Sequence, residues 1–226
     1  MIGIIGAMNI EVDILKGDME GAKTVCISGT EFVSGKLCGR EAVVAKCGVG
    51  KVNAALCTEA MIMEFSPELI INTGIAGSLS DKLSILDVAV ARAVVQHDFD
   101  ISFFGYETGE IPGLGIEIPS DGAISRAVEG IVKGMGVKCE YGVIVSGDQF
   151  ICDEDIKSSL SSRFSAVACE MEGASIGHVC HVNRVPFAVI RAISDSADGS
   201  PVDYDTFSEK AAHLSAKIVE SFIMSV

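Results

Sequence analysis

Short apolar runs rich in β-branched residues alternate along the chain with segments whose apolar residues recur every three or four positions. The first pattern is typical of buried strands, and the second is typical of amphipathic helices. The runs predict strands at residues 1–6, 24–28, 31–38, 41–47, 69–73, 87–95, 141–146, 165–170 and 186–193. The helical spacing predicts helices at residues 50–65, 171–182 and 207–222.

Hairpin-like strands come first along the chain, and a regular alternation of strands and helices follows. This order predicts an α/β fold, a three-layer αβα sandwich around a mixed central β-sheet. The 226 residues fit one domain that spans residues 1–226, because no linker, repeat or low-complexity tract divides the chain.

The net charge and the cysteine content limit which partners and which cellular compartment are expected for this protein. A formal net charge of −14 at pH 7 repels phosphodiester backbones and anionic membrane surfaces, so neither nucleic acid nor a membrane is expected as a partner. The apolar start at residues 1–7 is short and lacks a basic flank, which indicates a buried strand rather than a signal peptide. Eight scattered cysteines without a C-x-x-C pair favour reduced thiols in a cytoplasmic protein.

Polar or glycine-rich clusters directly follow four of the predicted strands. These clusters begin at Asn72, Ser146, Glu170 and Arg191. Ligands of open α/β sheets bind beyond the carboxyl ends of the strands. The four clusters therefore predict one binding site at a common edge of the sheet.

Four carboxylates and one arginine are candidates for chemistry. Glu11 lies early in the first helix, where it either benefits from the helix dipole or activates water. Glu170 and Glu172 share a face of an extended segment and suit ribose hydroxyls, although a solvated helix start is the alternative. Asp195 either caps a turn or is a buried neutral acid that donates a proton. Arg191 suits pairing with a glutamate or holding a ligand oxygen.

Two motifs of phosphate and metal sites are incomplete in this sequence. The run Gly48-Val49-Gly50-Lys51 resembles a phosphate-binding loop, but Ala45 stands where such a loop needs its first glycine. Val52 likewise stands where the loop needs serine or threonine. Of the cluster at 178–181 only the two histidines share a helix face, so no metal site is expected.

Seven clusters in order along essentially the whole chain resemble one known family. They occupy residues 3–8 with Glu11, 48–55, 72–77, 97–100, 146–151, 170–172 and 191–195. Together they resemble the 5′-methylthioadenosine/S-adenosylhomocysteine nucleosidases of the purine nucleoside phosphorylase superfamily. The resemblance implies an N-glycosyl hydrolase that releases adenine from these 5′-thionucleosides and from 5′-deoxyadenosine, without a metal or an organic cofactor.

The resemblance also implies roles for the matching residues. Asp195 would protonate or hydrogen-bond N7 of adenine, and Glu11, helped by Arg191, would hold and deprotonate the attacking water. Positive charge that develops on the ribosyl ring would be stabilised by the nearby carboxylates, including Glu172. The leaving purine gains negative charge, which a neutral acid relieves.

Further matching residues are implied to bind the purine and the sugar. Phe150 would stack on the purine, and the backbone of Ile151 would contact its Watson–Crick edge. Glu172 would bind the ribose hydroxyls, Met171 would pack beneath the sugar, and Glu170 would support the ribose side.

One departure from the family concerns the acid. Many relatives carry a small hydroxyl residue, which positions the acid, where this chain has Ile75. Backbone amides of a loop at 74–77 are expected to replace that hydroxyl at Asp195. Ile75 and Ala76 of this loop are expected to contact the substrate.

The resemblance implies an apolar pocket for the 5′ thioether. Its candidates by position are Met8, Ile101, Phe104, Pro112, Tyr204 and Phe207. In the family, the segment that holds Ile101 and Phe104 reaches the partner's site in a homodimer. The apolar run 100–105 would be a sticky patch on a monomer, which independently favours a dimer.

The residues near the expected position of the attacking group distinguish hydrolysis from other functions. A phosphorylase holds a phosphate dianion with basic groups or amides, whereas the N-terminal segment offers Glu11 and no Arg or Lys before Lys16. A phosphorylase of the same superfamily, a hydrolase of futalosine-type nucleosides and a non-catalytic nucleoside-binding module remain alternatives. The last would be indicated by loss of Glu11, Glu172 or Asp195, and all three are present.

Overall fold

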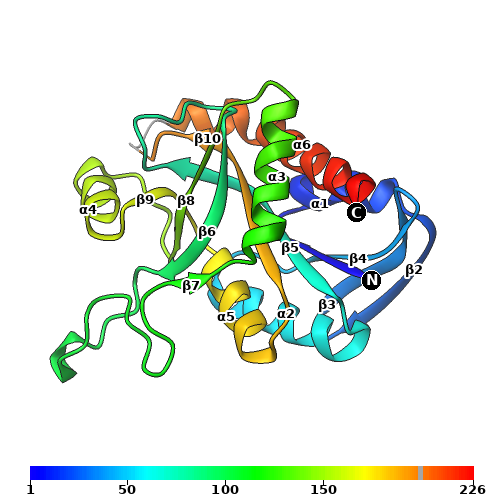
Figure 1. Cartoon of the computed structure of the whole chain (residues 1–226), viewed down its shortest axis with the longest axis horizontal. Helices are drawn as coiled ribbons and strands as arrows, with labels where there is room; N and C mark the ends of the chain where they lie inside the picture. Colours follow the sequence, from blue (N-terminus) through cyan, green and yellow to red (C-terminus); the bar gives the residue numbers. More distant parts are fainter. Residues whose placement is uncertain (198–200) are drawn as a thin grey trace.

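A mixed sheet of ten strands runs through the part of the chain that the structure describes, and helices cover both of its faces (Figure 1). The computed structural model describes residues 1–197 and 201–226, with only the backbone of 201–205. Its elements are β1 (Ile2–Gly6), α1 (Asn9–Gly17), β2 (Glu20–Ile27), β3 (Thr30–Leu37), β4 (Arg40–Lys46), α2 (Lys51–Phe65), β5 (Leu69–Ser78), β6 (Val88–Gln96), the 3-10 turn η1 (Ser102–Phe104), β7 (Ile118–Pro119), α3 (Gly122–Gly134), β8 (Cys139–Ser146), α4 (Glu154–Phe164), β9 (Ala166–Glu170), α5 (Gly173–Asn183), β10 (Phe187–Asp195) and α6 (Pro201–Ser225).

The strand order brings several carboxyl ends of strands to one place. The order across the sheet is β10-β6-β8-β9-β5-β1-β4-β3-β2, and β10 also pairs with β5, so five strands close into a ring. The antiparallel strands β5 and β9 pair only through Gly77 with Cys169 and Ser78 with Ala168. Because this overlap comprises the last two residues of β5 and the third and fourth of the five residues of β9, the carboxyl ends of the two strands lie close together. The parallel strand β10 ends beside them, with Asp195 opposite Gly77.

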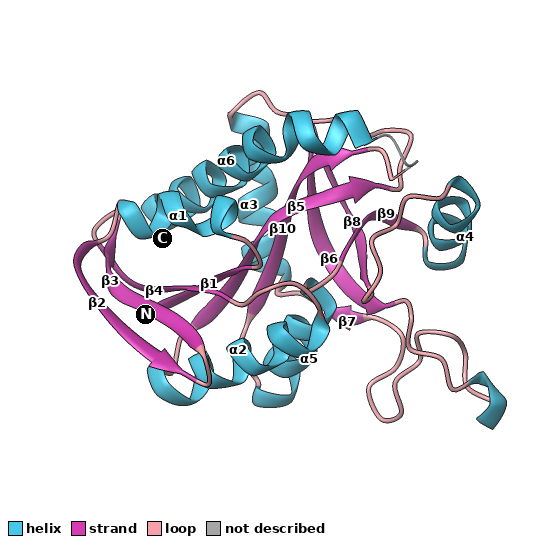
Figure 2. Ribbon diagram, turned by 180° about the vertical axis from the view of Figure 1, so that it is seen from behind, coloured by secondary structure: helices cyan, strands magenta, loops and turns pink. Residues whose placement is uncertain are grey.

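Helices lie on two opposite faces of the sheet, as Figure 2 shows from behind. On one face α1, α3 and α6 pack over a core that includes Leu15, Val132 and Phe222. On the other face α2 and α5 pack over a second core that includes Met61 and Ile176. The predicted fold class, three layers around a mixed central sheet, is confirmed.

The predicted strands and helices are all present, but the short strand β7 was not predicted. Four strands extend two residues or more beyond their predicted bounds: β2 and β8 begin earlier, and β5 and β10 end later. β5 continues to Ser78 and β10 to Asp195, so the polar clusters at 72–77 and 191–195 lie within strands rather than after them. The expectation of a loop at 74–77 is therefore wrong. Polar residues persist in these strands because both strands end at the site, where side chains have polar partners.

Helices α3 and α4 were missing from the predicted elements. Each begins at an aspartate whose carboxylate accepts hydrogen bonds from two N–H groups of the first turn, Asp121 in α3 and Asp153 in α4. Such N-caps are a start signal that is visible in the sequence. Exposed polar residues dilute the apolar periodicity of α4, and this weakens the helical pattern there.

Close packing of α5 against the sheet depends on Gly177. A Cβ added at Gly177 would lie 2.8 Å from the Phe187 ring and 2.8 Å from Val94. We predict that Gly177→Ala destabilises the fold, because overpacking a core costs about 1–3 kcal/mol and exceeds the helix propensity gain of about 0.8–1 kcal/mol. Chemical denaturation measures the change in the free energy of unfolding.

The matched control is Gly130→Ala in α3. Gly130 is exposed, and an added Cβ would meet nothing within 4 Å. This variant is expected to gain about 0.5–1 kcal/mol, since alanine lowers the conformational entropy of the unfolded chain. Equal effects of the two substitutions would contradict the packing argument.

Candidate active site

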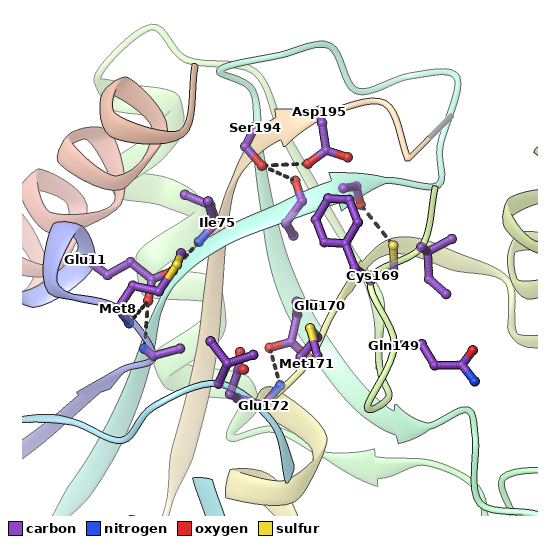
Figure 3. Close-up of a pocket in the computed structure, with 16 residues that line it drawn as sticks. Met8, Glu11, Ile75, Gln149, Cys169, Glu170, Met171, Glu172, Ser194 and Asp195 are labelled. Atoms are coloured by element: carbon purple, nitrogen blue, oxygen red, sulfur yellow. Dashed lines mark hydrogen bonds between the residues drawn. The ribbon is translucent and has the colours of Figure 1, made fainter. Parts of the chain in front are cut away.

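A cleft lies where β5, β9 and β10 end and where the segments after β1 and β8 fold over them (Figure 3). It contains about 690 Å³ of empty space, its open mouth included. That size is within the usual range of small-molecule sites. The cleft is lined by Ala7, Met8, Glu11, Val49, Ile75, Ala76, Gly77, Gln149, Phe150, Ile151, Cys169, Glu170, Met171, Glu172, Ser194 and Asp195.

Glu11 is held in the cleft by three backbone N–H groups. Its Oε2 accepts hydrogen bonds from Ala7 at 2.7 Å and Met8 at 2.9 Å, and its Oε1 accepts one from Ile75 at 3.1 Å. A Cβ at Gly74 would collide with Oε1, so glycine there permits the close approach. The two interpretations of Glu11 hold together: it belongs to the capping box of α1, and it faces the cleft.

Burial changes the acidity of Glu11. Desolvation of this buried side chain raises its pKa above the usual value, and the charge of Arg191 and the three N–H donors only partly oppose the rise. A carboxyl group with a raised pKa is a better proton acceptor than an ordinary surface carboxylate. Glu11 therefore has the geometry and the acidity of a general base.

Glu172 stands on the same cleft at the start of α5. Its Oε1 accepts a hydrogen bond from the backbone N–H of Gly50 at 2.8 Å. Burial raises the pKa of Glu172 to about 8, and the neighbouring Glu170 adds to the rise while Arg191 opposes it. With this pKa, Glu172 takes up a proton near neutral pH.

Glu170 and Arg191 form a buried ion pair behind the cleft. Nη2 of Arg191 donates to Glu170 and, at 2.5 Å, to Oδ1 of Asn72. Ser146 also donates to Glu170, and the backbone N–H of Gly173 donates at 2.7 Å. The pairing of Arg191 with a glutamate is thus as predicted.

Arg191 does not line the cleft, although the sequence placed it among the residues that act on the substrate. Its side chain is 2% exposed, and its guanidinium is engaged by Glu170 and Asn72. Burying an arginine without a partner costs much free energy. The side chain of Arg191 therefore turns to the buried carboxylate of Glu170 and not to the solvent side of the cleft. Its influence on Glu11 is through charge and not through contact.

Asp195 is buried at the end of β10, and both of its oxygens have donors. Ser194 donates from Oγ to Oδ2 at 2.8 Å, and the backbone N–H of Ala197 donates to Oδ1 at 2.9 Å. The bond to Ala197 makes Asp195 a turn cap as well as a residue of the cleft (Figure 3). Both interpretations of Asp195 therefore apply.

The hydroxyl group at Asp195 comes from Ser194 and not from the segment 74–77. The N–H of Ile75 is bonded to Glu11, and the N–H of Gly74 is bonded to Oγ of Ser215 at 3.2 Å. The expectation that amides of this segment replace the hydroxyl missing at Ile75 is therefore wrong. A neighbouring side chain on β10 supplies the donor instead.

Most predicted binding residues lie together, and the arm residues lie apart. Met8, Ile75, Ala76, Phe150, Ile151, Glu170, Met171 and Glu172 line the cleft, whereas Ile101, Phe104, Pro112 and Phe207 do not. The first three of these absent residues belong to an arm between β6 and β7 that projects from the body (Figures 1 and 2). Phe207 is half-buried on α6. The side chain of Tyr204 lies outside the described residues.

Sequence reasoning missed several residues of the lining. They are Ala7, Val49, Gly77, Gln149, Cys169 and Ser194. Each adjoins a predicted residue or lies in a predicted cluster, so proximity in sequence was an available signal. Gln149 points away from the carboxylates (Figure 3). Of the missed residues, Ser194 donates a hydrogen bond to Asp195, and the charge of Asp195 helps to raise the pKa of the Cys169 thiol.

Two further observations apply to the described part of the chain. No group of three or more His, Cys, Asp or Glu side chains there is arranged to hold a metal ion. None of its helices combines the length and the apolar character that crossing a membrane requires.

The raised pKa of Glu172 predicts a pH-dependent stability. A carboxyl group whose pKa rises from 4.5 to about 8 on folding binds its proton more tightly when folded, so stability falls as the pH rises across that window. Between pH 5 and pH 8 the free energy of unfolding of the wild type is expected to fall. In Glu172→Gln this fall is expected to be smaller by about 2–4 kcal/mol. Chemical denaturation at several pH values measures this.

The control is Glu64→Gln, which alters an exposed carboxylate of α2. It is expected to follow the wild-type pH dependence. If Glu172→Gln follows it as well, Glu172 does not carry the linked proton.

Comparison with known proteins places this site in a family. The model of the phosphorylase superfamily matches residues 1–224. The chain is 44% identical over 221 residues to the 5′-methylthioadenosine/S-adenosylhomocysteine nucleosidase of Shewanella sediminis, with 96% of each chain covered. It is 42% identical over 225 residues to the enzyme of that name from Staphylococcus haemolyticus, with 99% of each covered.

Solved structures give the same result. The nucleosidase of Neisseria meningitidis in complex with methylthio-immucillin-A superposes with a TM-score of 0.96 at 37% identity, covering 100% of this chain and 99% of that one. A futalosine hydrolase of Helicobacter pylori superposes with a TM-score of 0.95 at 37% identity, covering 100% and 97%. With full-length likeness in both sequence and structure, the chain belongs to the 5′-methylthioadenosine/S-adenosylhomocysteine nucleosidase family of the phosphorylase superfamily.

Proposed function

We propose that this protein hydrolyses the N-glycosidic bond of 5′-methylthioadenosine and S-adenosylhomocysteine, and also that of 5′-deoxyadenosine, releasing adenine and the 5′-substituted ribose. We further propose that residues 1–226 act as one nucleosidase domain. The observation that carries the proposal is the convergence of Glu11, Glu172 and Asp195 on one cleft. The relatives named for this activity match the chain over its full length.

The three carboxylates divide the chemistry by their surroundings. Glu11, with its raised pKa, accepts a proton from the attacking water. Asp195, buried and hydrogen-bonded by Ser194, donates a proton to N7 of the leaving adenine. Glu172 binds the ribose hydroxyls and, once ionised, stabilises the positive charge on the ribosyl ring.

Arg191 is assigned a supporting role in this scheme. It holds Glu170 in place, and its charge opposes the rise in the pKa of Glu11 and of Glu172. The positive charge favours the ionised form of both carboxyl groups. Arg191 thus favours the form of Glu11 that can accept a proton from water.

Phe150, Ile151 and Met171 bind the base and the sugar in this proposal. The half-exposed ring of Phe150 offers a face on which the purine stacks, and Ile151 lies buried beside it. Met8 and Ile75 give the opposite wall an apolar surface that suits a thioether.

The lining of the cleft favours water over phosphate as the attacking group. Among the described residues that line the cleft, none is Lys, Arg or His. A phosphorylase needs such groups or a set of free amides to hold the phosphate dianion, and the amides nearest to the attack position are bonded to Glu11. The carboxylate of Glu11 would repel the anion.

A homodimer is part of the proposal, with the arm at 97–117 reaching the partner's site. Phe103 and Phe104 are 92% and 73% exposed, and Val52, Leu56 and Met63 of α2 are exposed as well. Exposed apolar side chains on the arm and on α2 are each typical of an interaction surface. Ile101, Phe104 and Pro112 would then complete the 5′ pocket of the other subunit.

Sedimentation at micromolar concentration tests the dimer. We expect the wild type to sediment as a dimer and Phe104→Ser to weaken the association at least about tenfold, the loss expected when a buried aromatic anchor is removed. A wild-type protein that sediments as a monomer would remove the arm from the site.

The setting proposed for this activity is cytoplasmic salvage of methionine. All eight cysteines are free thiols, as expected in a reducing compartment. The small-molecule nucleoside is the only ligand that the proposed reaction requires besides water.

Product analysis tests the reaction. The protein is incubated with 5′-methylthioadenosine in phosphate-free buffer and again with phosphate added. We expect free adenine and methylthioribose in both. Release that requires phosphate and yields a sugar 1-phosphate would make the protein a phosphorylase, and the likeness to a futalosine hydrolase makes futalosine the next substrate if neither buffer gives release.

The same assay applied to two variants tests the assigned roles. Asp195→Asn and Glu11→Gln each keep the shape of the side chain but remove its proton chemistry, so we expect kcat to fall by a factor of about 10²–10⁴ while nucleoside binding persists. Calorimetry with the nucleoside is the control for binding. A variant that turns over at the wild-type rate would lose its assigned role.

A further inference from the structure

The glycine-rich run 48–51, incomplete as a phosphate-binding loop, holds other groups in this structure. The backbone of Gly50 has φ 97°, a conformation that favours glycine, and its N–H donates to Glu172. Lys51 is the first residue of α2, and its Nζ lies 2.6 Å from Oδ1 of Asp98. The lysine is therefore already neutralised by a carboxylate of the same chain.

Lys51, Asp98 and Asp148 form a closed cycle of hydrogen bonds between three separate segments. Oδ2 of Asp98 accepts from the backbone N–H of Asp148 at 2.9 Å. Oδ1 of Asp148 accepts in turn from the backbone N–H of Lys51 at 2.7 Å. The start of α2, the segment after β6 and the segment after β8 are joined by these bonds and by the ion pair.

Within the cycle, the ion pair of Lys51 and Asp98 is partly sheltered from solvent, whereas Asp148 is exposed. The side chains of Lys51 and Asp98 are 18% and 21% exposed, less than those of an ordinary surface pair. Burial would raise the pKa of Asp98, but the hydrogen bonds from Lys51 and Asp148 outweigh it and lower that pKa. Asp98 stays ionised, and a charge-assisted bond in partial shelter is stronger than an exposed one.

The cycle joins two walls of the cleft. Asp148 directly precedes Gln149, Phe150 and Ile151, which line the cleft on the purine side. The neighbour of Lys51 on the other side of the cycle is Gly50, which holds Glu172. The cycle therefore connects the segment on the purine side of the cleft to the residue that holds Glu172.

We propose that the cycle of Lys51, Asp98 and Asp148 is a positioning device that fixes the purine-side segment 149–151 relative to Glu172. The three residues act through the segment and not on the reacting atoms. The identity of the ligand rests on the proposed function, whereas the order of segment 149–151 does not depend on it.

The kinetic test uses Lys51→Met. Loss of the ammonium group frees the purine-side segment, so the KM for 5′-methylthioadenosine is expected to rise about tenfold while kcat changes less than about threefold. Lys51→Arg keeps the charge and is expected to restore most of the affinity. The control is Lys82→Met, because Lys82 is 80% exposed and only 3.7 Å from Glu140. An unchanged KM in Lys51→Met would overturn the proposal.

A second variant separates positioning from general damage to the fold. In Lys51→Met the carboxylate of Asp98 loses its ion-pair partner, so adding Asp98→Asn is expected to cause no further loss, or a partial recovery. Independent roles would instead give additive losses, and that result would contradict the cycle. Thermal unfolding of each variant shows whether the whole fold has changed.

Hydrogen exchange without substrate tests the inference independently of any activity. The backbone N–H groups of Gly147 and Asp148 at the start of this segment, which donate to Glu170 and Asp98, are expected to exchange about tenfold faster in Lys51→Met than in the wild type, with little change in the core strands. Unchanged exchange in this segment would overturn the positioning role even if the enzyme is active. Faster exchange in a protein that does not cleave 5′-methylthioadenosine would support the cycle while removing the proposed function.

Discussion

The arrangement of the site depends on one buried cation among three buried carboxylates. Arg191 is enclosed by the protein and pairs with Glu170, close enough to Glu11 and Glu172 for its charge to act on both. Burying so much charge costs free energy that a single ion pair only partly offsets. The remaining cost is lowered by backbone N–H donors at Glu11 and Glu172, and by the tendency of both groups to hold protons. Because one cation serves three carboxyl groups, the pKa values of Glu11 and Glu172 stay raised, and these groups can exchange protons.

The sheet provides the place where these charges meet. Strands β5 and β9 pair only near their carboxyl ends, and β10 ends beside β5. Side chains from three strand ends therefore reach one cleft, and α5 begins there with Glu172 at its first turn. Close packing of α5 through Gly177 holds that start in position. The electrostatic environment of each carboxyl group is thus set by elements far apart in the sequence.

The same electrostatics favours water as the attacking group. The cleft is lined by acids and apolar groups, and the nearby Lys51 is paired with Asp98. A phosphate dianion would meet carboxylates and bonded amides, whereas a water molecule would find an acceptor in Glu11. The full-length likeness to nucleosidases, one of them solved in complex with methylthio-immucillin-A, agrees with this interpretation of the cleft.

The sequence by itself determined the fold class, the strands other than β7 and the candidate carboxylates, because apolar periodicity and polar residues near strand ends are local properties of the chain. It did not reveal that β5 and β10 run through their polar clusters, or that Arg191 turns behind Glu170 instead of into the cleft. Nor did it indicate that Ser194 supplies the hydroxyl missing at Ile75, or that Lys51 closes a cycle with Asp98 and Asp148. Only the tertiary structure decided these points, since a side chain takes the partner that is nearest in space, and burial, which sets its charge, is a property of the packed fold.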